Sequence, residues 1–398
     1  MSSAKVLNFG PPKTVVPDKP GDLPSPALAK FLPVDDFSKD DKLAEYPHTL
    51  SSDLCWGSNS FPRGPKDYVV QLTPEEVRHV SEAITAFKAL NLENIALVSR
   101  ENFRLPSPLA KKLRDISDEV HNGRGFVVIR GLKAKQCTCS DEDGVIAFLG
   151  VMSYIGDVRC ANSNGMAMDH LRDAIRDEKP KGREHVELHP SKMMAPLKFH
   201  ADRKFADILA LFVKSKAASG GKQYLSSAWT VYNKMRESYP EDLRILVNEF
   251  PWPGVKDDQP HTTYSPVFFY KDGRIICQLV YRIFEGTNIL NSRQWHALDV
   301  LEEVANGVAI ELDVREGDIQ VINNLGLLHA RRGWIDRPGK ERYYYRLGLR
   351  DTEHGWPRPD NYETVFDDRY GVVPEDQIIP ITDFDPYGLT SLDDSGHG

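Results

Sequence analysis

The feature that most constrains this chain is a polar pair placed just before a long apolar stretch. The segment Phe199-His200-Ala201-Asp202 precedes the largely apolar residues 207–213. Because side chains alternate between the two faces of a β-strand, residues 200 and 202 share a face if the strand runs through them. That face then offers one imidazole nitrogen and one carboxylate oxygen to a single metal ion. The pattern predicts a sheet protein with part of a metal site beside a buried strand.

A second histidine is needed to complete such a site, and His329 is the candidate. Two histidines and one carboxylate on one side of a metal leave its other positions open, which is the ligand set of non-haem Fe(II) oxygenases. The spacing alone is weak, because the chain has 12 His and an acidic residue follows two positions later by chance about once in such a set. His185 and Glu187 form another such pair, which we interpret as surface residues.

Several further segments accompany the pair, and together they resemble one family. They are residues 216–221, 226–233, 317–324, 329–331 and 342–347. The His-x-Asp pair, a distal His and two Arg four residues apart resemble the TauD/TfdA-type Fe(II)/2-oxoglutarate-dependent dioxygenases. Here Arg342 follows His329 by 13 residues (342 − 329), and Arg346 lies four further on. The resemblance spans residues 120–355 and is greatest to the longer fungal, clavaminate synthase-like branch.

The resemblance implies a role for each of these residues. His200, Asp202 and His329 would be the catalytic metal ligands for Fe(II), with 2-oxoglutarate as cosubstrate and O2 at the open positions. Arg342 would hold the far carboxylate of 2-oxoglutarate, because Arg offers a planar, two-pronged donor. Arg346 shares its strand face by period two and would contact an anionic group of the substrate.

One position departs from the family pattern. Two residues after Ser-Gly-Gly the family places a Thr or Ser that bonds 2-oxoglutarate, and this chain has Gln223. The Gln amide can donate a hydrogen bond, but its greater length changes the geometry, and Ser226 is an alternative donor. Asp202 matches the family's oxygenases, because its halogenases have Ala or Gly at that position.

The function implied is a dioxygenase that releases succinate and CO2 while oxidising a small molecule. Hydroxylation, desaturation and oxidative cyclisation all remain open, with small anions, amino acids and secondary-metabolite precursors as candidate substrates. Two alternatives from other classes are a metal-binding jelly roll that has lost activity and a zinc hydrolase that uses the same ligands. Arg342 and Arg346 argue against both, because neither function needs two guanidinium groups beside the metal.

The pattern of short segments predicts an α+β fold with a mostly β core. Helices are expected from Thr73-Pro74, whose Glu76 completes a capping box, and at 107–122, 140–155, 229–239, 241–249 and 293–306. Strands are expected at 125–131, 157–172, 206–214, 223–228, 308–312, 319–323 and 342–349, with a hairpin at 265–281 turning at Asp272-Gly273. Many short strands with flanking helices suit a jelly roll, and the resemblance implies the cupin-like double-stranded β-helix.

The chain is expected to divide into three parts. Residues 1–70 read as a Pro-rich N-terminal arm and wrapping segment, 71–355 as the dioxygenase domain, and 356–398 as an acidic tail. Within the domain, 173–197 is long, charged and without periodicity, so we expect an active-site lid there.

The composition of the chain argues against two classes of binding partner, nucleic acids and membranes. A net charge of −8 argues against a nucleic-acid partner, and the longest apolar runs fall short of the ~20 residues of a membrane span. Five Cys form a sparse, odd set that predicts reduced thiols and a cytoplasmic protein. The expected partner is a small-molecule substrate, and the sequence makes no prediction of oligomeric state.

Overall fold

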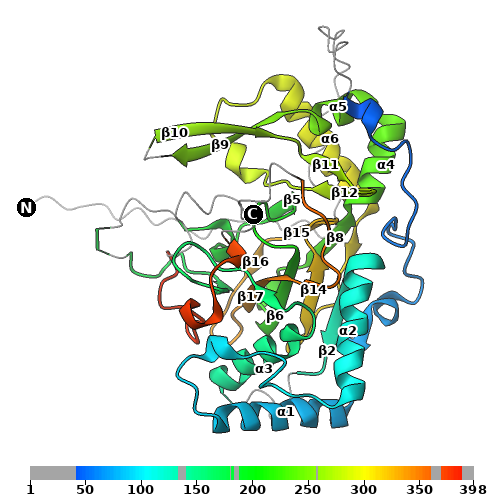
Figure 1. The fold of residues 1–398 in the computed structure, drawn as a ribbon. Helices are drawn as coiled ribbons and strands as arrows, with labels where there is room; N and C mark the ends of the chain where they lie inside the picture. The colour runs from blue at the N-terminus through cyan, green and yellow to red at the C-terminus, as the bar shows by residue number, and fades with distance from the viewer. Residues whose placement is uncertain are drawn as a thin grey trace, which may run out of the picture.

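The computed structural model describes residues 42–132, 140–179, 181–182, 188–256, 259–359 and 369–387. Its centre is a large sheet with strands in the order β1-β2-β14-β6-β17-β3, in which β4 also pairs with β17. A smaller sheet, in the order β13-β8-β15-β5, packs against it through a shared hydrophobic core (Figure 1). Two packed sheets with flanking helices form the double-stranded β-helix that the sequence predicted.

The helices lie within two residues of most of the predicted bounds. They are α1 Pro74–Ala89, α2 Ser107–Asn122, α3 Asp141–Ser153, α4 Ala228–Ser238, α5 Pro240–Val247 and α6 Ser292–Val308. The predicted capping box is present, because Thr73 Oγ1 accepts from the Glu76 N–H while the Glu76 carboxylate accepts from the Thr73 N–H.

The strands of the large sheet are β1 Val69–Gln71, β2 Phe126–Arg130, β3 Val158–Arg159, β4 Met168–Arg172, β6 Ile208–Ser215, β14 Ile319–Asn323 and β17 Tyr343–Arg350. Those of the smaller sheet are β5 Leu197–His200, β8 Gln223–Ser227, β13 Ile310–Glu311 and β15 Leu327–Arg331. The pairs outside them are β7 Ser219–Gly220 with β16 Trp334–Ile335, β9 Phe250–Lys256 with β10 Gln259–Ser265, and β11 Phe268–Lys271 with β12 Arg274–Cys277.

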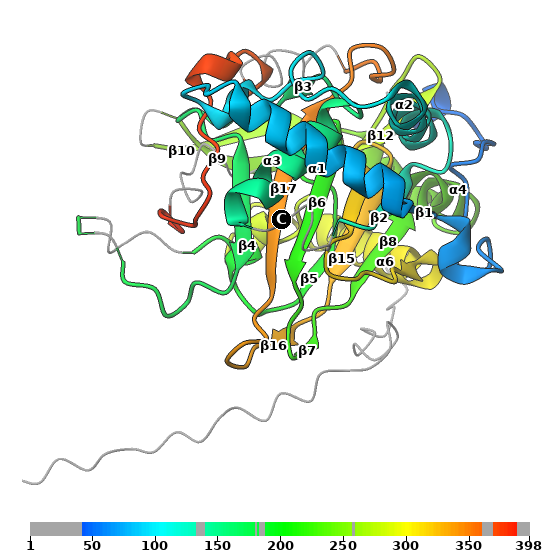
Figure 2. The same ribbon diagram turned by 90° about the horizontal axis from the view of Figure 1, so that it is seen from below.

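The two faces of the large sheet bury different cores. Alternate residues such as Val127, Ala210 and Phe212 pack outward against α1, α2 and α3, which cover that face in Figure 2. The residues between them, such as Leu209 and Leu211, point inward to the core shared with the smaller sheet and with α4, α5 and α6. This inner face holds the candidate site.

Glycine and proline shape two of the strand pairs that lie outside the sheets. The predicted hairpin is formed by β11 and β12, and its turn residues Asp272 and Gly273 both have positive φ, of 46° and 79°. The β9–β10 ribbon was not predicted, because Pro251, Pro253 and Gly254 argue against a strand. An isolated two-stranded ribbon tolerates them, since its Pro residues need not donate to a further strand.

The predicted N-terminal wrapping segment is described from residue 42 onward. Leu43, Leu50, Leu54 and Trp56 are buried in the core that lies between the two sheets. The arm up to residue 41, the pair His185 and Glu187, and the tail beyond 387 lie outside the described residues. Within the described part of the chain, no helix is long and apolar enough to cross a membrane.

Candidate metal and cosubstrate site

The three predicted metal ligands lie together on the smaller sheet and the loop that leaves it. His329 on β15 is directly opposite His200 on β5, and their ring centroids are 4.1 Å apart. Asp202 Oδ1 lies 3.6 Å from His200 Nε2 and 3.8 Å from His329 Nε2. Ligand atoms about 2.1 Å from one ion lie about 3.0–3.4 Å apart, so closing on a metal needs only a small inward movement.

Asp202 is not on the same strand as His200, although the sequence predicted that it would be. β5 ends at His200, and Asp202 lies in the loop beyond it rather than on the same strand. Asn324 fixes that loop, because its Oδ1 accepts from the Asp202 N–H while its Nδ2 donates to the carbonyls of Asp202 and Ala206, each at 2.8 Å. The main chain at Asp202 is therefore held by the Asn324 side chain, and the carboxylate is placed by this loop instead of by strand alternation.

Burial favours the neutral form of both imidazoles, which is the form that binds a metal. Burial lowers the pKa of His200, although Asp202 opposes the shift. Burial, then the neighbouring His200 and Arg346, lower the pKa of His329 well below its ordinary value. His200 Nδ1 lies 2.7 Å from the Lys198 carbonyl and therefore carries the proton, which leaves Nε2 to face Asp202. These three residues fit a divalent metal.

Arg342 lies in the same pocket as the three ligands, and within the described residues its guanidinium forms no ion pair with a carboxylate. Its side chain is 3% exposed, and its Nε and Nη1 have no hydrogen-bond partner among the described residues. The guanidinium lies 3.9 Å from the ring centre of Tyr344 and 4.9 Å from that of Trp334. Because a buried cation needs a counter-charge, this geometry fits the predicted contact with a carboxylate of 2-oxoglutarate.

Two further pocket residues were not assigned a role from the sequence. Arg331 is buried beside Arg342, which together with burial lowers its pKa, and its Nη2 donates to the carbonyls of Met193 and Ala195. Gln320 is 1% exposed, and neither atom of its amide has a partner within the described residues. Arg331 could have been predicted, because it lies two residues after His329 and therefore on the same strand face. Gln320 could not, because in the sequence it is one polar residue in an apolar strand.

The two candidates for the second cosubstrate contact lie on different faces of β8. Gln223 is paired with Arg331 and lines the pocket. Ser226 is paired with Leu328, one residue from His329, so its side chain points to the opposite face. The Ser226 alternative is therefore not supported, and Gln223 remains the candidate.

Arg346 is not a vacant anion-binding group. It lies on β17 with 3% of its surface exposed and forms ion pairs with Asp169 at 2.7 Å and Asp202 at 3.4 Å. Burial alone would lower its pKa, but the two carboxylates outweigh that effect and raise it. The substrate contact predicted for Arg346 would require an anion to compete with these two carboxylates.

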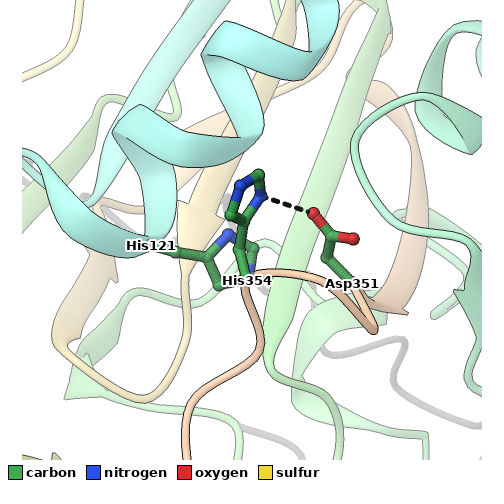
Figure 3. Close-up of side chains that lie close together, drawn as sticks. All are labelled: His121, Asp351 and His354. Atoms are coloured by element: carbon green, nitrogen blue, oxygen red, sulfur yellow. Dashed lines mark hydrogen bonds and ion pairs between the residues drawn. The ribbon is translucent and has the colours of Figure 1, made fainter.

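A second group of His and Asp side chains also brings its possible ligand atoms within 4.8 Å of one another, but its chemistry differs. His121, Asp351 and His354 lie where α2 meets the segment after β17 (Figure 3). Asp351 Oδ2 lies 2.9 Å from His354 Nδ1, 2.8 Å from Arg114 and 2.5 Å from the Ser117 hydroxyl. Asp351 Oδ2 thus has three partners, including a guanidinium, and Oδ1 accepts from the Glu353 N–H at 3.3 Å. Because both oxygens are engaged, we interpret this group as a polar junction.

Glu302 on α6 supports the strand that carries His200. Its Oε2 accepts from the Phe199 N–H at 2.9 Å, and burial raises its pKa from 4.5 to about 7. A carboxyl group whose pKa is higher in the folded than in the unfolded protein stabilises the fold at a pH below the unfolded-state pKa. This stabilisation is lost as the pH rises through the folded-state pKa of about 7.

Glu302→Gln keeps an oxygen for the Phe199 N–H and gives up the one that accepts from Asn306 Nδ2 at 3.1 Å. We still expect it to be more stable than the wild type at pH 8, by about 1–3 kcal/mol, because no buried charge remains. Near pH 5 the gain should be small, because wild-type Glu302 is mostly neutral there. Urea unfolding of both proteins at the two pH values measures this. An equal difference at pH 5 and pH 8 contradicts the expected titration.

Comparison with known proteins identifies the family of the chain. Residues 88–347 match the family described as "Taurine catabolism dioxygenase TauD, TfdA family". The chain is 32% identical over 326 residues to the taurine hydroxylase-like protein SAT17 of Stachybotrys chartarum, covering 78% of this chain and 82% of that protein. It is 24% identical over 303 residues to the FR-33289 synthase of Streptomyces rubellomurinus, covering 71% and 86% of the two chains.

Two solved structures share the fold at low sequence identity. An asparagine oxygenase bound to Fe(II), 3-hydroxyasparagine and succinate has a TM-score of 0.56 and 16% identity, covering 73% of this chain and 98% of its own. The non-haem iron oxygenase OrfP, bound to Fe and α-ketoglutaric acid (2-oxoglutarate), has a TM-score of 0.52 and 15% identity, with coverage of 71% and 94%.

The ligand geometry, the buried Arg342 and these matches define a non-haem iron oxygenase. The chain belongs to the TauD/TfdA family and is an Fe(II)/2-oxoglutarate-dependent dioxygenase.

Proposed function

We propose that this enzyme oxidises a small, amino-acid-like or secondary-metabolite substrate in the pocket beside His200, Asp202 and His329. The reaction is hydroxylation, desaturation or oxidative cyclisation, coupled to conversion of 2-oxoglutarate into succinate and CO2. The observation that carries the proposal is the buried Arg342 guanidinium, whose free donors lie in the same pocket as the metal ligands. A dicarboxylate bound there supplies the missing counter-charge.

The alternatives from other classes leave this guanidinium without a purpose. A zinc hydrolase needs the three ligands and a water molecule but no cation for a dicarboxylate. An inactive metal-binding protein likewise needs the three ligands but no buried cation for a dicarboxylate. Both are therefore less well supported than the oxygenase.

The chain's own residues position and shield the reactants. Bound Fe(II) and 2-oxoglutarate supply the oxidising chemistry, as cofactors do in such enzymes. Arg342 would hold the far carboxylate of 2-oxoglutarate, because its guanidinium lies in the same pocket as the three ligands. Leu209, Leu211 and Ile322 line the pocket and exclude water from it.

The expected lid is supported by contacts of its described residues. Ser191 and Leu197 line the pocket, and Arg331 holds the carbonyls of Met193 and Ala195 against it. Lys192 is 1% exposed and pairs at 2.8 Å with Asp383 from the C-terminal segment. We propose that residues 188–197 cover the substrate and that the C-terminal segment keeps them in place.

The substrate class rests on the relatives. The neighbouring structures contain hydroxylated asparagine or arginine, and a homologue is named as a synthase of FR-33289. We therefore propose a panel of amino acids, sulfonates and polar secondary metabolites, scored by succinate formation above the rate without prime substrate. At least one compound should raise this rate several-fold. A protein that forms no succinate with any compound, and does not bind 2-oxoglutarate, contradicts the proposal.

A further inference from the structure

Asp169 on β4 has no role in the family pattern found in the sequence, yet the strand register brings it to the metal site. It is paired with Arg346 on β17, and Arg346 is paired with Leu211 on β6. Directly paired residues of neighbouring strands point to the same face, so all three side chains lie on the inner face of the large sheet. Asp169 is 8% exposed and Arg346 is 3% exposed, so the two charges meet away from solvent.

The contacts form a chain that ends at a metal ligand. Arg346 Nε donates to Asp169 Oδ2 at 2.9 Å, and Arg346 Nη2 lies 2.7 Å from the same oxygen. On its other side, Arg346 Nη1 lies 3.4 Å from Asp202 Oδ2. Asp202 is therefore divided between two neighbours, because its Oδ1 faces both histidines and its Oδ2 faces the guanidinium.

A guanidinium beside a metal ligand can help or hinder metal binding. It orients the carboxylate when it contacts only the oxygen that does not bind the metal. It competes with the metal when the carboxylate is its sole counter-charge, because a buried cation gains most by pairing fully. The position of Arg346 between two carboxylates decides between these effects.

We propose that Asp169 is a positioning residue for the iron site. By holding Arg346 through two of its nitrogens, it keeps the guanidinium at Asp202 Oδ2, while Oδ1 faces the two histidines that share the metal. This inference rests on the proposed iron site. Partners one step beyond the ligands typically change metal affinity by about 10–100-fold, and we expect a loss in this range when Asp169 loses its charge.

The test is anaerobic titration of the metal-free protein with Fe(II). Asp169→Asn keeps the shape and removes the charge, so it should bind Fe(II) about 10–100-fold more weakly than the wild type. Asp169→Glu keeps the charge and should recover most of the affinity. The melting temperature of each metal-free variant serves as the measure of folding.

A double variant separates positioning from a direct effect of the Asp169 charge. In an Arg346→Gln background, Asp169→Asn should change Fe(II) affinity by less than about threefold, because the residue through which Asp169 acts is gone. The double variant removes both buried charges together, so neither is left unpaired, and its effect is compared with the loss in Asp169→Asn alone. The same loss in both backgrounds, or wild-type affinity in Asp169→Asn, overturns the inference. Failure of the wild type itself to bind Fe(II) instead overturns the proposed iron site.

Discussion

Asp202→Ala is expected to abolish iron-dependent succinate formation. Asp202 supplies the carboxylate of the group His200, Asp202 and His329. The two imidazoles that remain without it would hold a labile divalent ion poorly. His200→Ala and His329→Ala should have the same effect, with bound iron falling below one tenth of the wild-type content. Iron content and succinate yield, measured on the same preparations, give the result. Full activity with bound iron in any one variant removes that residue from the site.

His354→Ala is the matched control, because His354 belongs to the other His/Asp cluster. Its partner Asp351 already pairs with Arg114, so we expect His354→Ala to retain iron and activity. Glu187→Ala tests the second His-x-acid pair of the sequence and should also retain iron. If Glu187→Ala loses iron while Asp202→Ala does not, the wrong pair has been assigned.

Arg342→Lys is expected to raise the 2-oxoglutarate requirement by about 30-fold or more. The change keeps the charge but removes the planar fork, and loss of one partner of a buried charge-assisted contact costs about 2–5 kcal/mol. Arg342 is 3% exposed, and two of its donor nitrogens have no partner among the described residues. The free-energy cost should therefore be that of losing a buried contact rather than an exposed one. The rate at saturating 2-oxoglutarate should fall much less than the affinity.

The same substitution at a solvent-exposed arginine provides the comparison. Arg315 has 65% of its side chain exposed and pairs with Asp313. Arg315→Lys should leave the 2-oxoglutarate saturation curve within twofold of the wild type, because exposed ion pairs contribute about 0–1 kcal/mol. An unchanged curve in Arg342→Lys, with the protein folded, would exclude Arg342 from the cosubstrate site.

Local chemistry made much of the fold predictable. The capping box at Thr73 and the Asp272-Gly273 turn depend on neighbouring residues alone, and both are present as expected. The apolar stretch at 207–213 became β6 because its alternate residues are buried on both faces of the large sheet. The metal triad was predictable only by resemblance, since His329 is separated from His200 and Asp202 by more than a hundred residues of sequence.

Features that depend on strand register were not predictable. The pairing of Asp169 with Arg346, and the opposite face of Ser226, follow from which residues of distant strands lie side by side. The position of Asp202 depends on the Asn324 side chain rather than on strand alternation. Gln320 gave no signal, because an unpartnered amide becomes unusual only once its surroundings are known.

The most direct test of the account is an anaerobic titration of the Fe(II)-loaded protein with 2-oxoglutarate, followed by the charge-transfer absorption of the iron–cosubstrate complex. The wild type and His354→Ala should show the same saturable band with one equivalent bound. Asp202→Ala should show no band, and Arg342→Lys should need about 30-fold more 2-oxoglutarate to reach half of it. No band in the wild type, or the same titration curve in all four proteins, would contradict an iron and 2-oxoglutarate site built from His200, Asp202, His329 and Arg342.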